Sequence, residues 1–389
     1  MKKSFLIFAA VAGLFASCSN EVLVDNQQQA LSGDALSKAI SFSTFAQLAT
    51  RSAADYELEE YHLTFVVYGT KTDDNDGTVQ AVFGTNAAGA NTGVTCDYIA
   101  VAADRDATQA WHYTPARYWD TQSQYYFAAY TPATAPMTYT FANDGDEVGA
   151  TGTKFVTTSN YIIKGQNRMQ DEGVQRSEIK TGFDGIKGLK DIDMMVSDLN
   201  SQHGKTHDAN VDLIFRHTLA KLNVALDVER GVPNLGASGY KVLVKSVTVA
   251  DLNSTGSFTS TLSGTKYEPT WTVVGTDKVT YTFTDATGIE LDTSDKYFIE
   301  SLILPQDIAA SQIFTLNYQV ISIDDLGNEY TENFTYTLKL SDAFAGYTTY
   351  DEDTNYTIKF HINPENNVIV FDAGVYEWSN NVTGSKTIE

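Results

Sequence analysis

Short runs in which apolar residues occupy every second position recur along most of the chain of 389 residues, and this periodicity restricts the fold most. In LTFVVY, residues 63–68, the apolar side chains of Leu63, Phe65 and Val67 alternate along the run, as in a half-buried strand. Such runs are rich in Thr, Tyr and Val and are separated by Gly, Asn, Asp and Thr. The pattern predicts antiparallel β-sandwiches rather than alternating strands and helices.

The runs form two series, and the chain length suggests two domains. The first series covers residues 63–68, 79–83, 95–101, 125–130, 139–141, 154–163, 194–196 and 211–228, and the second covers 241–250, 256–262, 270–274, 278–284, 297–304, 314–323, 329–340, 356–362 and 368–378. Between them, GVPNLGASG has the densest turn composition of mid-chain, which predicts a domain boundary at residue 231. One helical turn is expected over residues 307–312.

The first 18 residues, MKKSFLIFAAVAGLFASC, have the order of a bacterial lipoprotein signal. Lys2 and Lys3 precede an apolar stretch that is too short to span a bilayer, and small residues stand directly before Cys18. This pattern predicts a lipoprotein signal peptide over residues 1–17, with Cys18 as the lipid-modified first residue of the mature protein. Cys96 is then the remaining cysteine, for which we expect an inert, buried thiol.

The chain is strongly acidic, with 26 Lys and Arg against 49 Asp and Glu, a formal net charge of −23. Such a charge repels nucleic acid and anionic lipid, so no nucleic-acid partner is predicted. With 42% hydrophobic and 12% aromatic residues, the chain has enough apolar side chains to build cores.

Residues 38–69 contain two strand-like runs joined by a polar segment with a single arginine. In the first run Ile40 and Phe42 alternate with serines, and Arg51 is the only Lys or Arg between residues 39 and 70. Small residues flank Arg51, as is typical of exposed segments that proteases cut. On this stretch alone, an ordinary surface loop with a solvated arginine remains the alternative.

Motifs of metallohydrolases, serine hydrolases and nucleotide-binding proteins are not found in the sequence. His217 lies in a strand-like run and is interpreted as a structural hydrogen-bonding residue rather than a general base. The segment 73–77 is interpreted as an acidic turn, because Phe83 stands where a calcium loop needs its closing Glu. Asp191 and Asp193 stay open as paired acids, although charge at the end of a strand is preferred. No metal, cofactor or enzymatic activity is predicted.

An aromatic group in the first half has two interpretations. It consists of Trp119, Tyr125, Tyr126, Phe127 and Tyr130. These rings can stack on sugars, but in a β-rich chain they more often pack in the core.

In their order along the chain, several stretches resemble the fimbrillin family, the lipoprotein precursors of type V pili in Gram-negative gut and oral bacteria. The lipobox at Cys18 is followed by a polar spacer, a strand at 39–43, then Thr50-Arg51 and a second strand ending FVVY. Further matches are ARYW (116–119), YFAAYTP (126–132), DMMV (193–196), VDLIFRHTLAKL (211–222), LPQ (304–306), YTIKF (356–360), VIVF (368–371) and VYEW (375–378).

The resemblance implies an all-β protein of two tandem transthyretin-like, Greek-key β-sandwich domains with little helix, covering residues 52–230 and 231–389. It also implies a lipidated propeptide, residues 18–51, carried to the cell outer membrane. An arginine-specific protease would cut Arg51–Ser52 and remove the first strand, and a strand of another subunit would fill the vacated groove.

In that interpretation the removable strand fills its groove with the side chains of Ile40, Phe42, Phe45 and Leu48. Each side chain contributes about 1.5–3 kcal/mol if fully buried. The candidate donor strand covers residues 368–388 and includes Val368, Val370, Val375 and Trp378.

The predicted function is that of a structural subunit of a cell-surface fimbria that supports adhesion. Its predicted partners are other fimbrial subunits, the arginine-specific protease and a host or bacterial surface receptor. Two other classes are weighed against it: a surface-anchored glycan-binding lipoprotein, and a secreted hydrolase, which the missing motifs disfavour.

Overall fold

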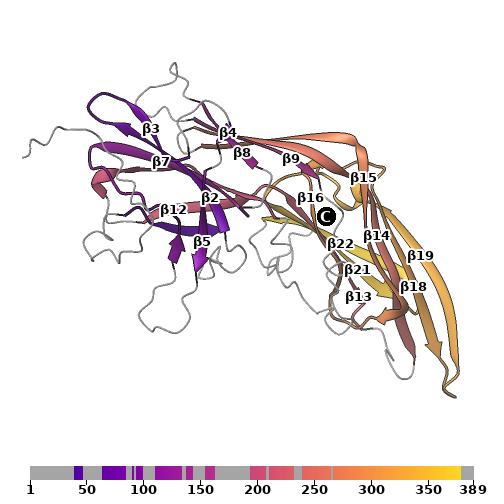
Figure 1. Cartoon of the computed structure of the whole chain (residues 1–389). Helices are drawn as coiled ribbons and strands as arrows, with labels where there is room; N and C mark the ends of the chain where they lie inside the picture. Colours follow the sequence, from indigo (N-terminus) through magenta and orange to yellow (C-terminus); the bar gives the residue numbers. More distant parts are fainter. Residues whose placement is uncertain are drawn as a thin grey trace, which may run out of the picture.

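The computed structural model describes residues 39–46, 64–84, 90–91, 93–99, 110–133, 137–142, 154–162, 193–206, 210–231, 239–263 and 266–377. Over these residues the chain consists of strands and the turns and loops that join them. The helical elements are the short helix α3 (Leu340–Ala343) and the 3-10 turn η3 (Gly204–Thr206). Figure 1 shows two lobes, an indigo to magenta N-terminal lobe and an orange to yellow C-terminal lobe. The all-β prediction is confirmed, whereas the helical turn expected at 307–312 is wrong, since β17 (Gln306–Asp307) and a turn occupy this segment.

The N-terminal lobe contains a nine-stranded sheet, in which β1-β12-β10-β7-β2-β5-β6 are neighbours, β11 pairs with β7 and β3 pairs with β2. The two end strands of this order, β1 and β6, contact each other, so the sheet curls around an aromatic core. The strands are β1 (Phe42–Ala46), β2 (Thr64–Asp73), β3 (Val79–Phe83), β5 (Val94–Ile99), β6 (Ala110–His112), β7 (Ser123–Thr131), β10 (Met195–Ser197), β11 (Asn200–His203) and β12 (Val211–His217).

A long hairpin connects the two lobes. Its strands, β14 (Tyr240–Ser263) and β15 (Lys266–Glu290), pair with each other, and Figure 1 shows them running across the top of the molecule. The first half of β14 pairs with β18 and the second half pairs with β9. The resulting seven-stranded sheet has the order β19-β18-β14-β9-β8-β4, completed by β4 (Ala90–Asn91), β8 (Met137–Ala142), β9 (Lys154–Ile162), β18 (Ile313–Ile323) and β19 (Glu329–Lys339).

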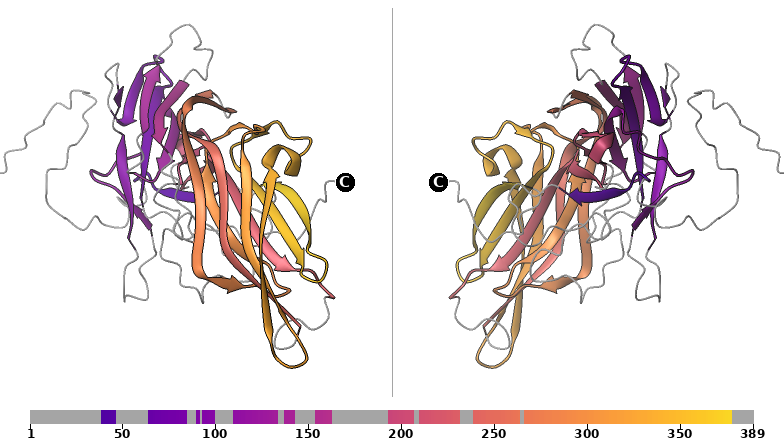
Figure 2. Two further views of the ribbon diagram at one scale, coloured as in Figure 1. Left: turned by 90° about the vertical axis from the view of Figure 1, so that its right-hand side faces the viewer. Right: turned by 90° about the vertical axis from the view of Figure 1, so that its left-hand side faces the viewer.

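The C-terminal lobe also contains a four-stranded sheet of order β16-β13-β21-β22. The strands are β13 (Ala220–Val228), β16 (Lys296–Ile303), β21 (Thr354–Asn363) and β22 (Val368–Glu377), and a short pair is formed by β17 and β20 (Thr349–Tyr350). In Figure 2 the yellow strands β21 and β22 lie together at one side of this lobe. Strand β13 precedes residue 231 but pairs with β16 and β21, which follow it. The sheets therefore do not divide at the predicted boundary.

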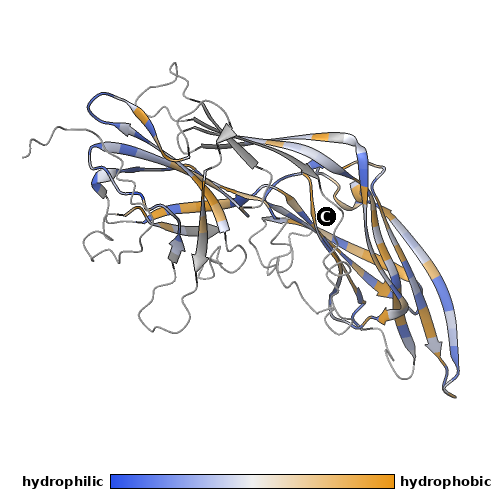
Figure 3. Ribbon diagram, in the orientation of Figure 1, coloured by the Kyte–Doolittle hydropathy of each residue, from blue (hydrophilic) through white to orange (hydrophobic). Residues whose placement is uncertain are grey.

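The larger of two cores fills the C-terminal lobe and extends to one face of the nine-stranded sheet. On β13 the side chains of Leu222, Val224 and Leu226 belong to this core. Figure 3 shows hydrophobic and hydrophilic segments alternating along the strands, as the sequence periodicity predicts. No helix in the described part of the chain is long and apolar enough to cross a membrane.

Candidate strand-acceptor groove

Strand β1 lies at one end of the nine-stranded sheet and pairs in parallel with β12. The register runs from Phe42 opposite Val211 to Ala46 opposite Phe215. Before the strand begins, the Ile40 N–H donates a hydrogen bond to the Arg117 carbonyl at 2.8 Å. These contacts join β1 to segments more than 70 residues away in sequence, so β1 is a separate piece added to the edge of a sheet.

The second core lies under β1 and is mostly aromatic. The ring of Phe42 is 5% exposed and meets the rings of Phe65, Phe83, Tyr113 and Phe127 edge to face, with centroids 5.5–5.9 Å apart. Such offset contacts add to the free energy of burial. Phe42 therefore occupies a slot whose walls come from β2, β3, β7 and the segment after β6.

Ile40 is the second apolar anchor of this segment. Its side chain is 2% exposed and belongs to the same core as Phe42. The Tyr113 hydroxyl donates a hydrogen bond to the Ile40 carbonyl at 2.7 Å, and burial raises the pKa of Tyr113. Tyr113 therefore remains a neutral donor at physiological pH and fixes the backbone at the entrance of the groove.

The other face of β1 is polar and holds the register. The Ser41 hydroxyl donates to Asn210 Oδ1 at 2.6 Å, and the Ser43 hydroxyl donates to Asp212 Oδ1. Both contacts are exposed, so they contribute little to stability compared with the buried rings. The alternation predicted from Ile40 and Phe42 against the serines is confirmed.

Most of the floor of the groove belongs to strands that β1 does not hydrogen-bond. The central strands β2 and β7 supply Phe65, Val67, Phe127 and Ala129, which are all fully buried. If β1 leaves, β12 gains an unpaired edge and these apolar side chains lose their cover. An open edge above an apolar slot is the arrangement that accepts an added strand.

The sequence profile of the fimbrillin-like proteins matches residues 66–378, which is most of the chain. The chain belongs to the fimbrillin-like family. A comparison with curated proteins finds no match. Among solved structures, the fimbrillin-like fold is similar to a fimbrial protein from Bacteroides vulgatus, with a TM-score of 0.53 and 14% identity over 88% of this chain and 100% of the other. The fimbrial anchor protein Mfa2 from Porphyromonas gingivalis also matches, with a TM-score of 0.30 and 14% identity over 87% of this chain and 97% of that one.

Other predicted site residues of this fimbrillin-like chain are only partly placed. In β1, the backbone of Phe45 lies opposite Ile214 of β12. Cys18, Leu48, Arg51, Ser52 and Trp378 lie outside the described residues. The lipid site and the cleavage site therefore stay predictions.

The candidate donor strand β22 is paired along its whole length with β21, from Thr354 opposite Glu377 to Asn363 opposite Val368. Val368 and Val370 are 46% and 53% exposed, whereas Val375 is half-buried against the larger core. The predicted donor side chains thus lie on opposite faces of one strand. In this structure β22 completes its own sheet.

The histidine and the acid singled out in the sequence lie together between the lobes. His217 Nδ1 is 3.0 Å from Asp193 Oδ1, and both side chains are buried. Close by, Arg216 makes two hydrogen bonds to the carboxylate of Asp198, at 2.8 and 2.9 Å. The structural interpretation of His217 is consistent with this pairing.

The residues proposed for other kinds of site have structural roles. The aromatic group of the first half is buried, and so is Cys96. The segment 73–77 forms a turn in which the Gly77 N–H donates to the Asp73 carbonyl at 2.9 Å. The core-packing and acidic-turn interpretations are therefore confirmed, and the alternative that these rings stack on sugars is not supported, because they are buried.

Sequence reasoning missed the residues that form the floor of the groove and the residues at the junction between the two lobes. Phe83 of β3, Trp111 of β6 and Tyr113 of the loop after β6 contact β1 or belong to its core, and none of these segments carries a motif. Their aromatic character was visible in the sequence, but nothing local indicated which strand would cover them. Asp353, whose carboxyl pKa burial raises to about 6, was missed because nothing in the acidic segment 351–353 indicates which of its three carboxylates is buried.

Proposed function

We propose that this protein is a structural subunit of a cell-surface fimbria, supports adhesion to a surface receptor, and assembles when another subunit's strand replaces β1. Family membership supports the fimbrial role. The observation that carries the mechanism is the position of β1, an edge strand whose Ile40 and Phe42 fill an aromatic slot. The predicted cleavage site Arg51–Ser52 follows it directly in the sequence.

In the proposed pathway, lipid on Cys18 holds the precursor at the outer membrane while β1 fills its own groove. An arginine-specific protease then cuts Arg51–Ser52, so β1 is no longer covalently part of the sandwich. A donor strand from a second subunit pairs with the exposed edge of β12 and inserts apolar side chains where Ile40 and Phe42 were. The free energy of this burial offsets the entropy lost on association.

For the donor strand we retain residues 368–388 as the candidate. Strand β22 is an edge strand of its sheet and pairs with β21 alone among the described strands. An edge strand loses one ladder of hydrogen bonds on leaving, whereas an inner strand loses two. Release of β22 also exposes the inward side chains of Ile369 and Phe371, which would become the groups inserted into a neighbour's groove.

The test compares the precursor, protease-treated protein and an Arg51→Ala variant by size-exclusion chromatography and electron microscopy. We expect ladders or fibres only from treated protein with an intact Arg51. Arg230→Ala is the matched control, since Arg230 is exposed and lies far from β1 in sequence. Equal assembly of Arg51→Ala and wild type would refute the mechanism, and so would cut protein that stays monomeric in the presence of partner subunits.

A further inference from the structure

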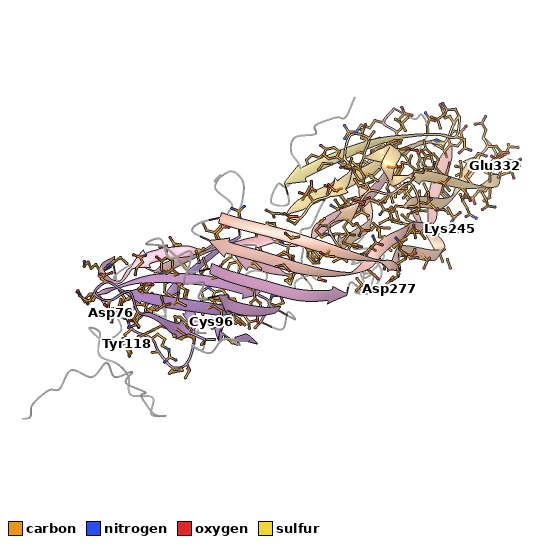
Figure 4. All side chains as sticks on the ribbon, turned by 90° about the horizontal axis from the view of Figure 1, so that it is seen from above. Asp76, Cys96, Tyr118, Lys245, Asp277 and Glu332 are labelled. Carbon is orange, nitrogen blue, oxygen red and sulfur yellow. The ribbon has the colours of Figure 1, made fainter. Side chains whose placement is uncertain are left out.

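Strand β19 is the outer strand of the seven-stranded sheet and has no strand on its far side among the described residues. It pairs with β18 over its full length, from Ile313 opposite Lys339 to Ile323 opposite Glu329, with no shift of register. Eight of the eleven residues of β19 are exposed, and Tyr330 is 58% exposed. In Figure 4 Glu332 points outward at the far end of the C-terminal lobe.

The free edge of β19 is regular and carries one charged side chain, Glu332, between its charged ends. In an antiparallel ladder, alternate residues direct their N–H and C=O groups away from the paired neighbour, so half of the β19 groups face outward. Proteins usually block such edges with Pro, Lys or a bulge. Between residues 330 and 338 this strand has no Pro, no Lys and no bulge. An edge of this kind is a template for another strand.

The sequence of β19, EYTENFTYTLK, is complementary to itself when reversed about Phe334. In an antiparallel pair of two copies centred there, Glu329 lies opposite Lys339 and Thr331 lies opposite Thr337. On the other face Tyr330 lies opposite Leu338 and the two Phe334 rings meet. Opposite charges, Thr pairs and aromatic pairs are the cross-strand partners that stabilise sheets.

Neighbouring registers lack this match. A pair centred on Glu332 places the two Glu332 carboxylates opposite each other, which is unfavourable. A pair centred on Asn333 leaves Glu329 opposite Thr337 and gives Lys339 no partner in the strand. If one copy of β19 is moved by a single residue along the other, the outer face of one strand lies beside the inner face of the other.

We propose that β19 is a self-association edge, at which two copies of this chain pair antiparallel about Phe334 and join their sheets. The occupant is a second copy because the charged ends of the strand match each other in reverse order. Glu329 already contacts Lys241 Nζ at 2.9 Å, and its side chain is still 52% exposed, so the carboxylate has room for the partner's Lys339. The contact lies outside the groove of β1 and forms whether or not Arg51 is cut.

Disulfide cross-linking tests the register in cells that express the full chain. Thr331→Cys together with Thr337→Cys places two thiol pairs opposite each other in the dimer, and mild oxidation should give a band of twice the mass on a non-reducing gel. Each single variant is the control. With one cysteine per β19, the two introduced thiols lie about six residues, roughly 20 Å, apart in the dimer and should not react.

Cross-linking by a single variant as strong as by the double variant would overturn the proposal, because it indicates random collision. A folded double variant that gives no dimer would overturn it too. The experiment is repeated with Arg51→Ala, in which strand exchange is blocked. Cross-linking should persist there, so failure of this contact and failure of the proposed assembly pathway can be told apart.

Charge reversal tests the same contact without new cysteines. Lys339→Glu places two like-charged pairs in the interface and should weaken the dimer about tenfold in sedimentation experiments. Adding Glu329→Lys to that variant reverses both charges and should restore dimerisation. The exposed control Asp325→Asn, in the turn before β19, should leave it unchanged. A double reversal that dimerises no better than Lys339→Glu would overturn the register.

Discussion

Phe42 connects the first strand to the aromatic core more strongly than any polar contact of that strand. Its ring meets four other rings, whereas the serines of β1 make exposed hydrogen bonds. In the proposed pathway, Phe42 holds β1 in place before cutting, and a donor strand would need an equivalent side chain. The strength of the proposed exchange would then depend on how well a donor side chain fills this aromatic slot.

Replacing Phe42 by Ala in the uncut precursor should lower the free energy of unfolding by about 3–5 kcal/mol, because a buried ring is lost and a cavity remains. Urea unfolding followed by tryptophan fluorescence measures the change. Val370→Ala, at an exposed position of β22, should cost less than about 0.5 kcal/mol. A loss under about 1 kcal/mol for Phe42→Ala would show that the ring contributes little to the hold on β1.

Asp353 gives the junction between the lobes a pH-dependent stability. Its N–H donates to the Leu219 carbonyl at 3.0 Å, and burial raises the pKa of its carboxyl from the ordinary value of 3.8 to about 6, partly opposed by His217 and Arg216. Between these two pH values the folded chain retains a proton that the unfolded chain has lost. This group therefore reduces stability as the pH rises through that range.

Asp353→Asn should remove this dependence, since Asn is neutral and tolerates the positive φ of 53° at this position. Relative to wild type, the variant should gain up to about 3 kcal/mol between pH 4 and pH 7. Urea unfolding of both proteins across this pH range measures the difference between their free energies of unfolding. The contributions of the other titrating groups cancel in this difference. Asp325→Asn, at an exposed turn, is the control. Parallel stability curves for Asp353→Asn and wild type would contradict the assignment.

At the scale of elements, strands could be predicted wherever apolar and polar residues alternate without interruption. The strand over residues 79–83 has the predicted bounds, and the predicted burial of Ile40 and Phe42 is confirmed. The single run predicted over 211–228 is wrong, because β12 and β13 are separate strands in different sheets. The turn between them continues the apolar pattern, so no break between the two strands is visible in the sequence.

The same break changes which side chains share a face. If residues 211–228 formed a single strand, the even spacing of Leu213, Phe215 and Leu219 would place them on one face, and all three are buried. Leu213 and Phe215 belong to the groove core, whereas Leu219 lies beyond β12 and belongs to the larger core. Even spacing predicts a shared face only within one strand. The parallel partner of β1 was also unpredictable, since 169 residues separate the paired positions and no local pattern selects β12.

Strand β22 allows a test of donor identity at this scale. Lys359→Cys together with Asp372→Cys places two thiols at directly opposed positions of β21 and β22. When oxidised, this variant should form no fibres after cutting at Arg51, because β22 cannot leave its sheet, and reduction should restore assembly. Electron microscopy of both states provides the comparison, with each single cysteine variant as control. Fibres formed by the oxidised protein would show that a segment other than β22 is the donor strand.

At the scale of the whole molecule, net charge opposes association. Removing residues 1–51 takes away four basic and three acidic residues, which leaves 22 against 46, a charge of −24. In the proposed pathway, proteolysis would therefore open the groove without reducing the repulsion between subunits. A donor strand would have to approach a like-charged surface before any apolar contact forms, so long-range electrostatics should limit the rate rather than the final extent of assembly.

Added salt should therefore speed the assembly of cut protein, because ions screen repulsion beyond a Debye length of about 10 Å at 0.1 M. Light scattering after proteolysis, at ionic strengths from about 0.02 to 0.2 M, measures the rate. Arg51→Ala treated in the same way should scatter no more at high salt than at low salt, which separates fibre growth from salting-out. The contacts of Phe42 in the groove are buried and apolar, and we expect the same of the donor side chain that takes its place. The amount of fibre at equilibrium should therefore change less with salt than the rate of assembly. If salt slowed assembly instead, attractive charge pairs between subunits would control the encounter, and the net charge of −24 would be the wrong quantity to consider.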